Sequence, residues 1–200
     1  MNRKLLLLAF GLSGMTSLIY EILWSRPLQL IFGSTIYAVS TILTTFFVGF
    51  ALGSYLFRHK ADAAKNPVLL FSLLQIGIGI YGFFILKLFT ILPQAYLSLE
   101  ISGLQFVQFG LLFLVLILPT TLFGATWPVA NKAYIKGERV GKDAGLLYSF
   151  NSFGSSLGPL SAGFMLLPLF GITKTAILVA SLNLVMGIGL FMYSKKGDSR

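Results

Sequence analysis

The sequence feature that most constrains this chain is the long apolar run at residues 5–32, which carries a single carboxylate, Glu21, inside it. As a helix that rises about 1.5 Å per residue, this run would reach roughly 42 Å, more than the hydrocarbon core of a bilayer requires. We therefore predict a tilted membrane span that holds Glu21 buried or half-buried. An ionisable side chain at that depth is costly and is by default a candidate for a functional site.

Apolar runs of similar length recur along the whole chain, in which 56% of the residues are hydrophobic and 10% are charged. This composition is typical of membrane proteins and not of soluble domains. We predict an all-α polytopic membrane protein with one transmembrane domain over residues 1–200 and no soluble domain. The first run is too long for a signal peptide and lacks a small-residue cleavage site, so it is expected to remain as a span. The six expected spans lie at roughly 5–32, 35–57, 67–92, 104–130, 145–170 and 172–194.

Basic residues are concentrated in the connections on one side of the expected spans. Twelve of the 15 lysines and arginines fall on the side that holds both ends of the chain, and Arg26, Lys87 and Lys174 fall on the other. Because cytoplasmic loops carry the excess of positive charge, the pattern predicts a multi-pass protein of the cell (inner) membrane with both termini in the cytoplasm. Topology thus explains the net charge of +9. The lipid bilayer is the expected partner, and nucleic acid is not.

The residue inventory excludes several kinds of catalytic site. The chain has no cysteine, and His59 is its only histidine, so disulfides, thiolate chemistry and multi-histidine metal sites are excluded. A Gly-x-Gly-x-x-Gly pattern begins at Gly77, but it lies inside an apolar run, so we interpret it as a helix-packing face and not as a dinucleotide loop. No nucleophile–base set is present. We expect no enzyme activity, no cofactor and no metal.

Two of the runs carry glycines four residues apart: Gly49 and Gly53 in the second, Gly154 and Gly158 in the fifth. Residues four apart share a helix face, and small ones let another backbone come close. The second and fifth runs occupy matching places in two three-helix halves. Because three is odd, the second half must be inverted, so the pattern favours the inverted repeats of transporters. The general frequency of glycine in membrane helices is the alternative explanation.

The fourth run ends in a segment that contains Pro119 and Pro128. Each proline removes a backbone donor, so we predict a helix break near the cytoplasmic end of this run. Thr120, Thr121 and Thr126 could satisfy the freed carbonyl groups. The segment could line a cavity as a broken helix, or it could be a tolerated proline kink.

Glu21 allows three interpretations: an ion pair with Arg26 five residues later, a protonated carboxyl group, or a site that awaits a cationic ligand. Trp24 shares the helix face of Glu21 and could add an aromatic surface to a cation site. Three amide side chains inside other runs must also find partners; such groups usually join helices, and a substrate contact is the alternative. The candidate substrate-binding residues are Glu21, Trp24, Arg26, Gln75, Asn151 and Asn183.

Several short motifs, taken together, resemble one family. They are Leu18-Ile-Tyr20-Glu21 with Trp24-x-Arg26, Gly49-Phe-Ala-Leu-Gly53-Ser, Pro119-Thr through Gly124-Ala-Thr-Trp-Pro128, Tyr148-x-x-Asn151, and Leu167-Pro-x-x-Gly171. This combination resembles the membrane domain of spermidine-synthase-like proteins.

The resemblance implies a membrane region similar to half of a major facilitator superfamily transporter. In that family it is commonly fused to a soluble aminopropyltransferase-like domain that uses decarboxylated S-adenosylmethionine. No soluble domain follows Arg200 in this sequence, so aminopropyltransferase activity would need a separate domain. The resemblance also raises the prospect of a polyamine as the ligand of Glu21, because a polyamine requires carboxylates and aromatic faces.

Two functions remain open. In the first, the chain is the transmembrane module of a spermidine-synthase-like protein and has a transporter-like role in moving or handling a small cationic, polyamine-like molecule. A six-helix half would then pair as a homodimer, with the small-residue faces of the second and fifth runs as the contact. In the second, the chain is a non-transporting membrane anchor or accessory subunit for a soluble aminopropyltransferase-like partner or another membrane complex.

Overall fold

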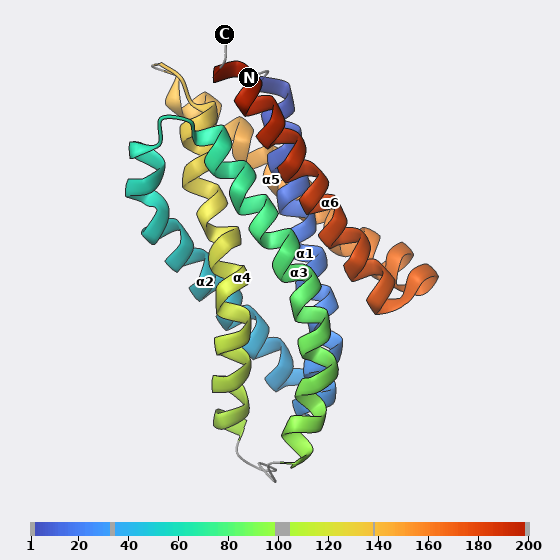
Figure 1. Cartoon of the computed structure of the whole chain (residues 1–200). Coiled ribbons are helices and arrows are strands. Elements are labelled where there is room, and N and C mark those ends of the chain that lie inside the picture. The colour runs from blue at the N-terminus through green and yellow to red at the C-terminus, as the bar shows by residue number, and fades with distance from the viewer. Residues whose placement is uncertain (1–2, 33–34, 99–104, 138, 199–200) are drawn as a thin grey trace.

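The computed structural model describes residues 3–32, 35–98, 105–137 and 139–198, and this part of the chain is helical apart from short turns, without a strand (Figure 1). The all-α prediction is confirmed. The elements are α1 (Arg3–Phe32), α2 (Thr35–Ala63), α3 (Pro67–Ser98), α4 (Gln105–Tyr134), α5 (Val140–Ser161), the short π-helix η1 (Ala162–Leu166) and α6 (Leu167–Asp198).

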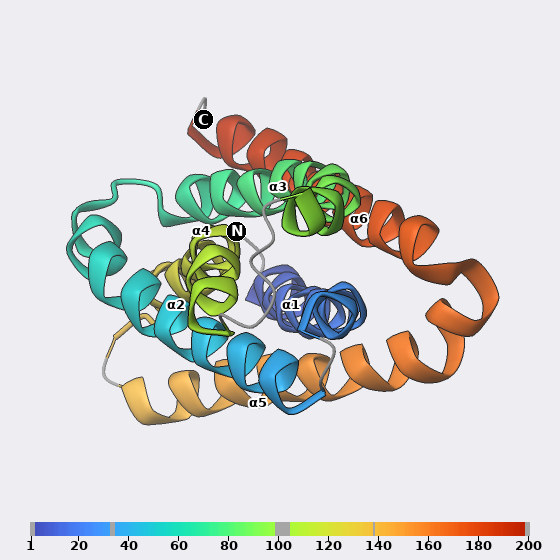
Figure 2. The ribbon, with the colours of Figure 1, turned by 90° about the horizontal axis from the view of Figure 1, so that it is seen from below.

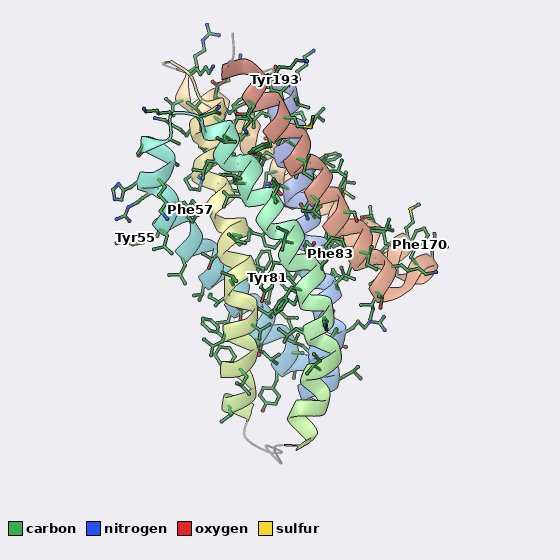
Figure 3. All side chains as sticks on the ribbon, in the orientation of Figure 1. Tyr55, Phe57, Tyr81, Phe83, Phe170 and Tyr193 are labelled. Atoms are coloured by element: carbon green, nitrogen blue, oxygen red, sulfur yellow. The ribbon has the colours of Figure 1, made fainter. Side chains whose placement is uncertain are left out.

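Five helical segments of the described chain are long and apolar enough to cross a membrane, which corrects the expected six. The expected spans 145–170 and 172–194 form one segment, Val140–Lys196, because no polar connection separates them. The segment nevertheless turns back at Gly171, whose backbone (φ 71°, ψ 176°) is open essentially to glycine alone. α5 and α6 are therefore the two arms of a V, with Phe170 at its tip (Figure 2, Figure 3).

The first helix occupies the middle of the molecule. Figure 2 shows α1 surrounded by the other helices. In the apolar part of α1, 61% of the residues are buried, compared with 39–44% in the other four segments. Both termini lie at one end of the bundle, together with the α2–α3 and α4–α5 connections (Figure 1). Because α1 is central, a polar side chain on it faces other helices over most of its circumference.

The helices pair in a pattern that is symmetric along the sequence. The three most extensive contacts join α2 to α4, α3 to α6 and α1 to α5. If α1 is exchanged with α4, α2 with α5 and α3 with α6, the first and third of these pairs are exchanged and the second is unchanged. The main packing of the bundle therefore joins the first three helices to the last three.

The crossing of α2 and α4 depends on glycine. A Cβ atom on Gly49 would collide with Thr120, and one on Gly53 would collide with the carbonyl group of Thr121. From the other side, a Cβ on Gly124 would lie only 2.6 Å from the Cα of Phe50. The two backbones touch, and no larger residue fits at this crossing.

The crossing of α1 and α5 is built in the same way. A Cβ atom on Gly154 would collide with the carbonyl group of Gly11, and one on Gly158 would lie 2.5 Å from the carbonyl oxygen of Met15. The small-residue faces of α2 and α5, which we expected to join two copies of the chain, are thus covered by α4 and α1. That expectation is wrong because the complementary surfaces lie within the chain.

The predicted helix break does not occur, since α4 runs continuously through both Pro119 and Pro128. Pro119 has no N–H to donate to the carbonyl group of Val115, four residues earlier. The hydroxyl group of Tyr81 donates to that carbonyl at 2.6 Å, and Figure 3 shows Tyr81 between α3 and α4. A neighbouring helix supplies the missing donor, so the proline remains inside α4.

The second proline of α4 is accommodated similarly. Pro128 leaves the carbonyl group of Gly124 without its helical donor, and Ser54 Oγ of α2 donates to it at 3.0 Å. The three threonines that we expected in this role do not reach these carbonyls, because a helical threonine bonds only three or four residues back. They donate instead to the carbonyl groups of Leu116, Ile117 and Phe123.

We expect Tyr81→Phe to lower the free energy of unfolding by about 1–2 kcal/mol, because the carbonyl group of Val115 loses its donor. In a Pro119→Ala background the same change should cost almost nothing, since the new backbone N–H can donate to Val115. Thermal unfolding of the four proteins in detergent measures this coupling, with Tyr193→Phe as the exposed control. An equal loss of unfolding free energy in both backgrounds would contradict the assignment of Tyr81 as the donor to Val115.

Candidate functional site

A cavity of about 300 Å³ lies between α1, α2, α4 and α5. Helical periodicity assembles it: α1 contributes a stripe at positions 10, 13, 14, 17, 18 and 21, and α2 contributes one at 43, 46, 47 and 50. The polar lining residues are Ser13, Ser17, Glu21, Thr126, Asn151 and Ser155. The aromatic lining residues are Phe10, Phe46, Phe47, Phe50, Phe123 and Trp127.

Glu21 is half-buried at the cavity wall. Within the described residues it makes no hydrogen bond or ion pair, and the one ion pair found there joins Arg3 to Asp143. Of the described residues that line this cavity, Glu21 alone is acidic. The carboxyl group therefore faces the cavity without a charge partner among the residues that the structure describes.

The ion pair between Glu21 and Arg26 that we considered does not form. Five residues correspond to about 140° around an ideal helix, so the two side chains leave α1 on different faces. Arg26 is exposed and lines a second cavity of about 300 Å³ beside Gly163, Pro168 and Gly171, where α5 and α6 diverge. The interpretation of Glu21 as the partner of Arg26 is wrong for this geometric reason.

Aromatic rings form most of the cavity wall opposite the hydroxyl groups. Phe46 stacks on Phe50, with the ring centroids 4.7 Å apart, and also packs against Phe123. Phe10 packs against Trp127 at 5.4 Å. Rings that pack on one another in this way are held in place, and an aromatic face that is free attracts cations.

Two amide side chains hold the polar wall in place. Gln75 is fully buried behind α1 and donates to Ser13 Oγ at 2.6 Å. Asn151 lines the cavity itself and donates to the carbonyl group of Phe10 at 3.1 Å. Gln75 therefore positions a cavity residue, while Asn151 is both a helix-joining group and a wall residue.

Besides Arg26 and Gln75, two further candidates lie outside the cavity. Asn183 is fully buried and joins α6 to α1, because it accepts from Thr16 Oγ1 at 3.0 Å and donates to the carbonyl group of Val179. Trp24 is buried and stacks on Tyr20 at 5.7 Å. The structure thus brings Glu21 and Asn151 to one cavity and places Trp24, Arg26 and Asn183 elsewhere.

Most residues of the cavity wall were not predicted, although the sequence carries a signal for them. On α1, Ser13, Ser17 and Glu21 are spaced four residues apart, and Phe46 and Phe50 are four residues apart on α2. A search for polar stripes on otherwise apolar helices would have found the first set. The contributions of Thr126 and Trp127 depend on the α2–α4 crossing and have no local signal.

The fold and the cavity together define an all-helical protein whose apolar helices are compatible with an integral membrane protein. Over the described ranges, no three His, Asp or Glu side chains gather in a group that could hold a metal ion. No protein-family model, curated protein sequence or solved structure matches the chain.

Proposed function

We propose that this chain is a membrane module with a transporter-like role, which binds and moves a small cationic, polyamine-like molecule by way of the cavity beside Glu21. The observation that carries the proposal is the carboxyl group of Glu21, which faces a cavity on the central helix without an ion-pair partner in the described chain. The resemblance to the membrane domain of spermidine-synthase-like proteins suggests the polyamine class. The proposed role is binding and movement, without chemical conversion.

The charge balance of the cavity favours a cation. A carboxylate among apolar helices loses hydration that only an opposite charge or several hydrogen bonds can replace. A ligand ammonium group would supply that charge, and each aromatic face beside it would add about 0.5–2 kcal/mol. The hydroxyl groups of Ser13 and Ser17 could accept its remaining N–H groups.

The size of the cavity favours a narrow ligand. Its volume of about 300 Å³ is at the lower limit of small-molecule sites, which span roughly 300–1,000 Å³. The cavity is elongated along one stripe of α1, from Phe10 to Glu21. A linear amine with its ammonium group at Glu21 and its methylene groups along the phenylalanines matches this arrangement.

In the proposed topology, the segment Val140–Lys196 crosses the cell membrane twice because it turns back at Gly171, so that the five apolar segments make six crossings in two inverted halves, α1–α3 and α4–α6. The exchange of helix contacts between the halves supports this arrangement, and an even number of crossings agrees with both termini lying at one end. The excess of lysine and arginine at that end supports a cytoplasmic location for both termini. A homodimer would have to use faces other than the two glycine crossings.

Uptake of radiolabelled spermidine into proteoliposomes tests the proposal. We expect Glu21→Gln to lower the initial rate at subsaturating spermidine by about tenfold or more, because a charge-assisted contact contributes about 1.5–3 kcal/mol. Asp62→Asn is the matched control, since it removes a carboxylate from the exposed end of α2 outside the cavity. The control should transport like the wild type.

Two outcomes would count against the proposal. Equal uptake by wild type and Glu21→Gln would remove Glu21 from the pathway. Saturable spermidine binding that needs Glu21, without any uptake above protein-free liposomes, would favour the non-transporting accessory role for a soluble aminopropyltransferase-like partner.

A further inference from the structure

A second charged cavity, of about 200 Å³, lies at the end of the bundle that holds both termini. Three cationic side chains line it: Arg3 at the start of α1, and Lys132 and Lys136 at the end of α4. The first turn of α3, at Pro67 and Val68, closes it from a third side. Among the residues that the structure describes, no acidic side chain lines this cavity.

The positive charges of this cavity are only partly balanced by the protein. Arg3 forms an ion pair with Asp143, donates to the carbonyl group of Tyr134 at 3.3 Å and lies over the Tyr134 ring. Lys132 and Lys136 have no acidic partner among the residues that the structure describes. Lys132 lies in the last turn of α4 and Lys136 lies just beyond its end, and both line the same cavity, where like charges repel. An anion in the cavity would remove that repulsion.

The position of the cavity at the ends of the apolar segments indicates which kind of anion would bind there. Arg3 begins one apolar segment, Pro67 begins another, and Tyr134, beside the cavity, ends a third. The ends of membrane spans lie where lipid headgroups meet water. A phosphate group at this level can contact arginine and lysine together, because both donate to its oxygens.

The cavity beside Arg26 repeats this construction. The cavity beside Arg26 lies between the end of α1 and the start of α6, as the basic cavity lies between the end of α4 and the start of α3. These element pairs are interchanged by the same exchange of halves that relates the main helix contacts. Arg3 and Arg26 are separated by roughly 35 Å of helix, close to the thickness of a bilayer core.

We propose that the cavity lined by Arg3, Lys132 and Lys136 is a binding site for the phosphate group of an anionic lipid. The site is distinct from the Glu21 cavity and does not depend on what that cavity binds. The lipid headgroup would join the ends of α1, α3 and α4 at the basic end of the bundle. Asp143 holds Arg3 in place through their ion pair.

Isothermal titration calorimetry of the full chain in non-ionic detergent tests the proposal, with dihexanoyl phosphatidylglycerol as the probe. We expect saturable binding that the double variant Lys132→Gln, Lys136→Gln weakens by about tenfold or more, given that each basic residue near a membrane surface contributes appreciably. The matched control is Lys195→Gln, Lys196→Gln, which removes the same charge at the same end but outside the cavity. Its affinity should stay within about twofold of wild type.

Two further probes identify the source of the phosphate. Dihexanoyl phosphatidylcholine, whose headgroup carries no net charge, should bind weakly and without sensitivity to the lysine variants. Inorganic phosphate should bind much more weakly than the phosphatidylglycerol; equal affinity would assign the site to free phosphate and overturn the lipid assignment. Equal losses in the two double variants, or no saturable binding of any probe, would overturn the site itself.

Discussion

Gly154→Val is expected to lower the free energy of unfolding by roughly 3 kcal/mol, the upper end of the usual cost of overpacking. The reason is that a Cβ atom at this position collides with the carbonyl group of Gly11 and comes within 3.1 Å of its Cα atom. A flexible side chain could move aside, but the backbone of the central helix cannot. The variant must therefore separate α1 from α5 and displace Asn151, three residues away on the cavity wall.

Gly189→Val is the matched control for this change. Gly189 also lies inside a long helix, but a Cβ atom there meets nothing within 4 Å. Thermal unfolding in detergent, followed by circular dichroism, should show a midpoint lower by roughly 6–12 °C for the Gly154 variant and little change for the control. Similar midpoints for the two variants would show that the α1–α5 contact is not as close as described.

Arg3→Gln is expected to be the next most damaging substitution, with a loss of about 2 kcal/mol. Asp143 is buried, with 7% of its surface exposed, and Arg3 is its ion-pair partner. Removal of one partner of a buried pair costs about 3–5 kcal/mol, and we expect less here because half of the Arg3 side chain is exposed to solvent. The loss comes from the carboxylate that stays behind without its cation.

The two partners differ in exposure to solvent, and this difference provides the test. Asp143→Asn should cost less than Arg3→Gln, because the arginine that remains can reach water. Adding Asp143→Asn to Arg3→Gln should restore part of the lost stability, since no unpaired buried charge is left. Lys142→Gln removes one positive charge beside Asp143 from an exposed side chain and is the control. A lower unfolding midpoint for the double variant than for Arg3→Gln would refute the argument.

The helical architecture could be predicted because apolar run length alone determines which segments can be long apolar helices. The same criterion could not resolve how the last two runs are joined. The sequence from Leu166 to Thr173 contains no charged residue, and whether Gly171 adopts a positive φ depends on how α5 and α6 pack on α1 and α3. The donors to the carbonyl groups of Val115 and Gly124 could not be predicted either, since they come from helices far away in the sequence.

Of the candidate site, only the charged residue, Glu21, could be recognised clearly from the sequence. Glu21 stood out because a carboxylate inside an apolar run is rare, and the structure places it at the cavity wall. The side chain of Arg26 was misplaced because proximity in sequence was taken for proximity on the helix surface. Asn183 and Gln75 could not be distinguished from Asn151 by their surroundings in the sequence, since all three are amides in apolar runs. Which of them faces a cavity is decided by helix crossings.

The pairing of α1 with α5 and of α2 with α4 has a consequence for biosynthesis. Because the largest contacts join the early helices to the late ones, the first three helices have few interfaces to form with one another when they leave the ribosome. They would enter the lipid as loosely associated segments, and the central helix would expose Glu21 until α4 and α5 arrive. Assembly of this protein should therefore be a late, concerted event, and premature termination after α3 should yield a product that quality-control proteases degrade.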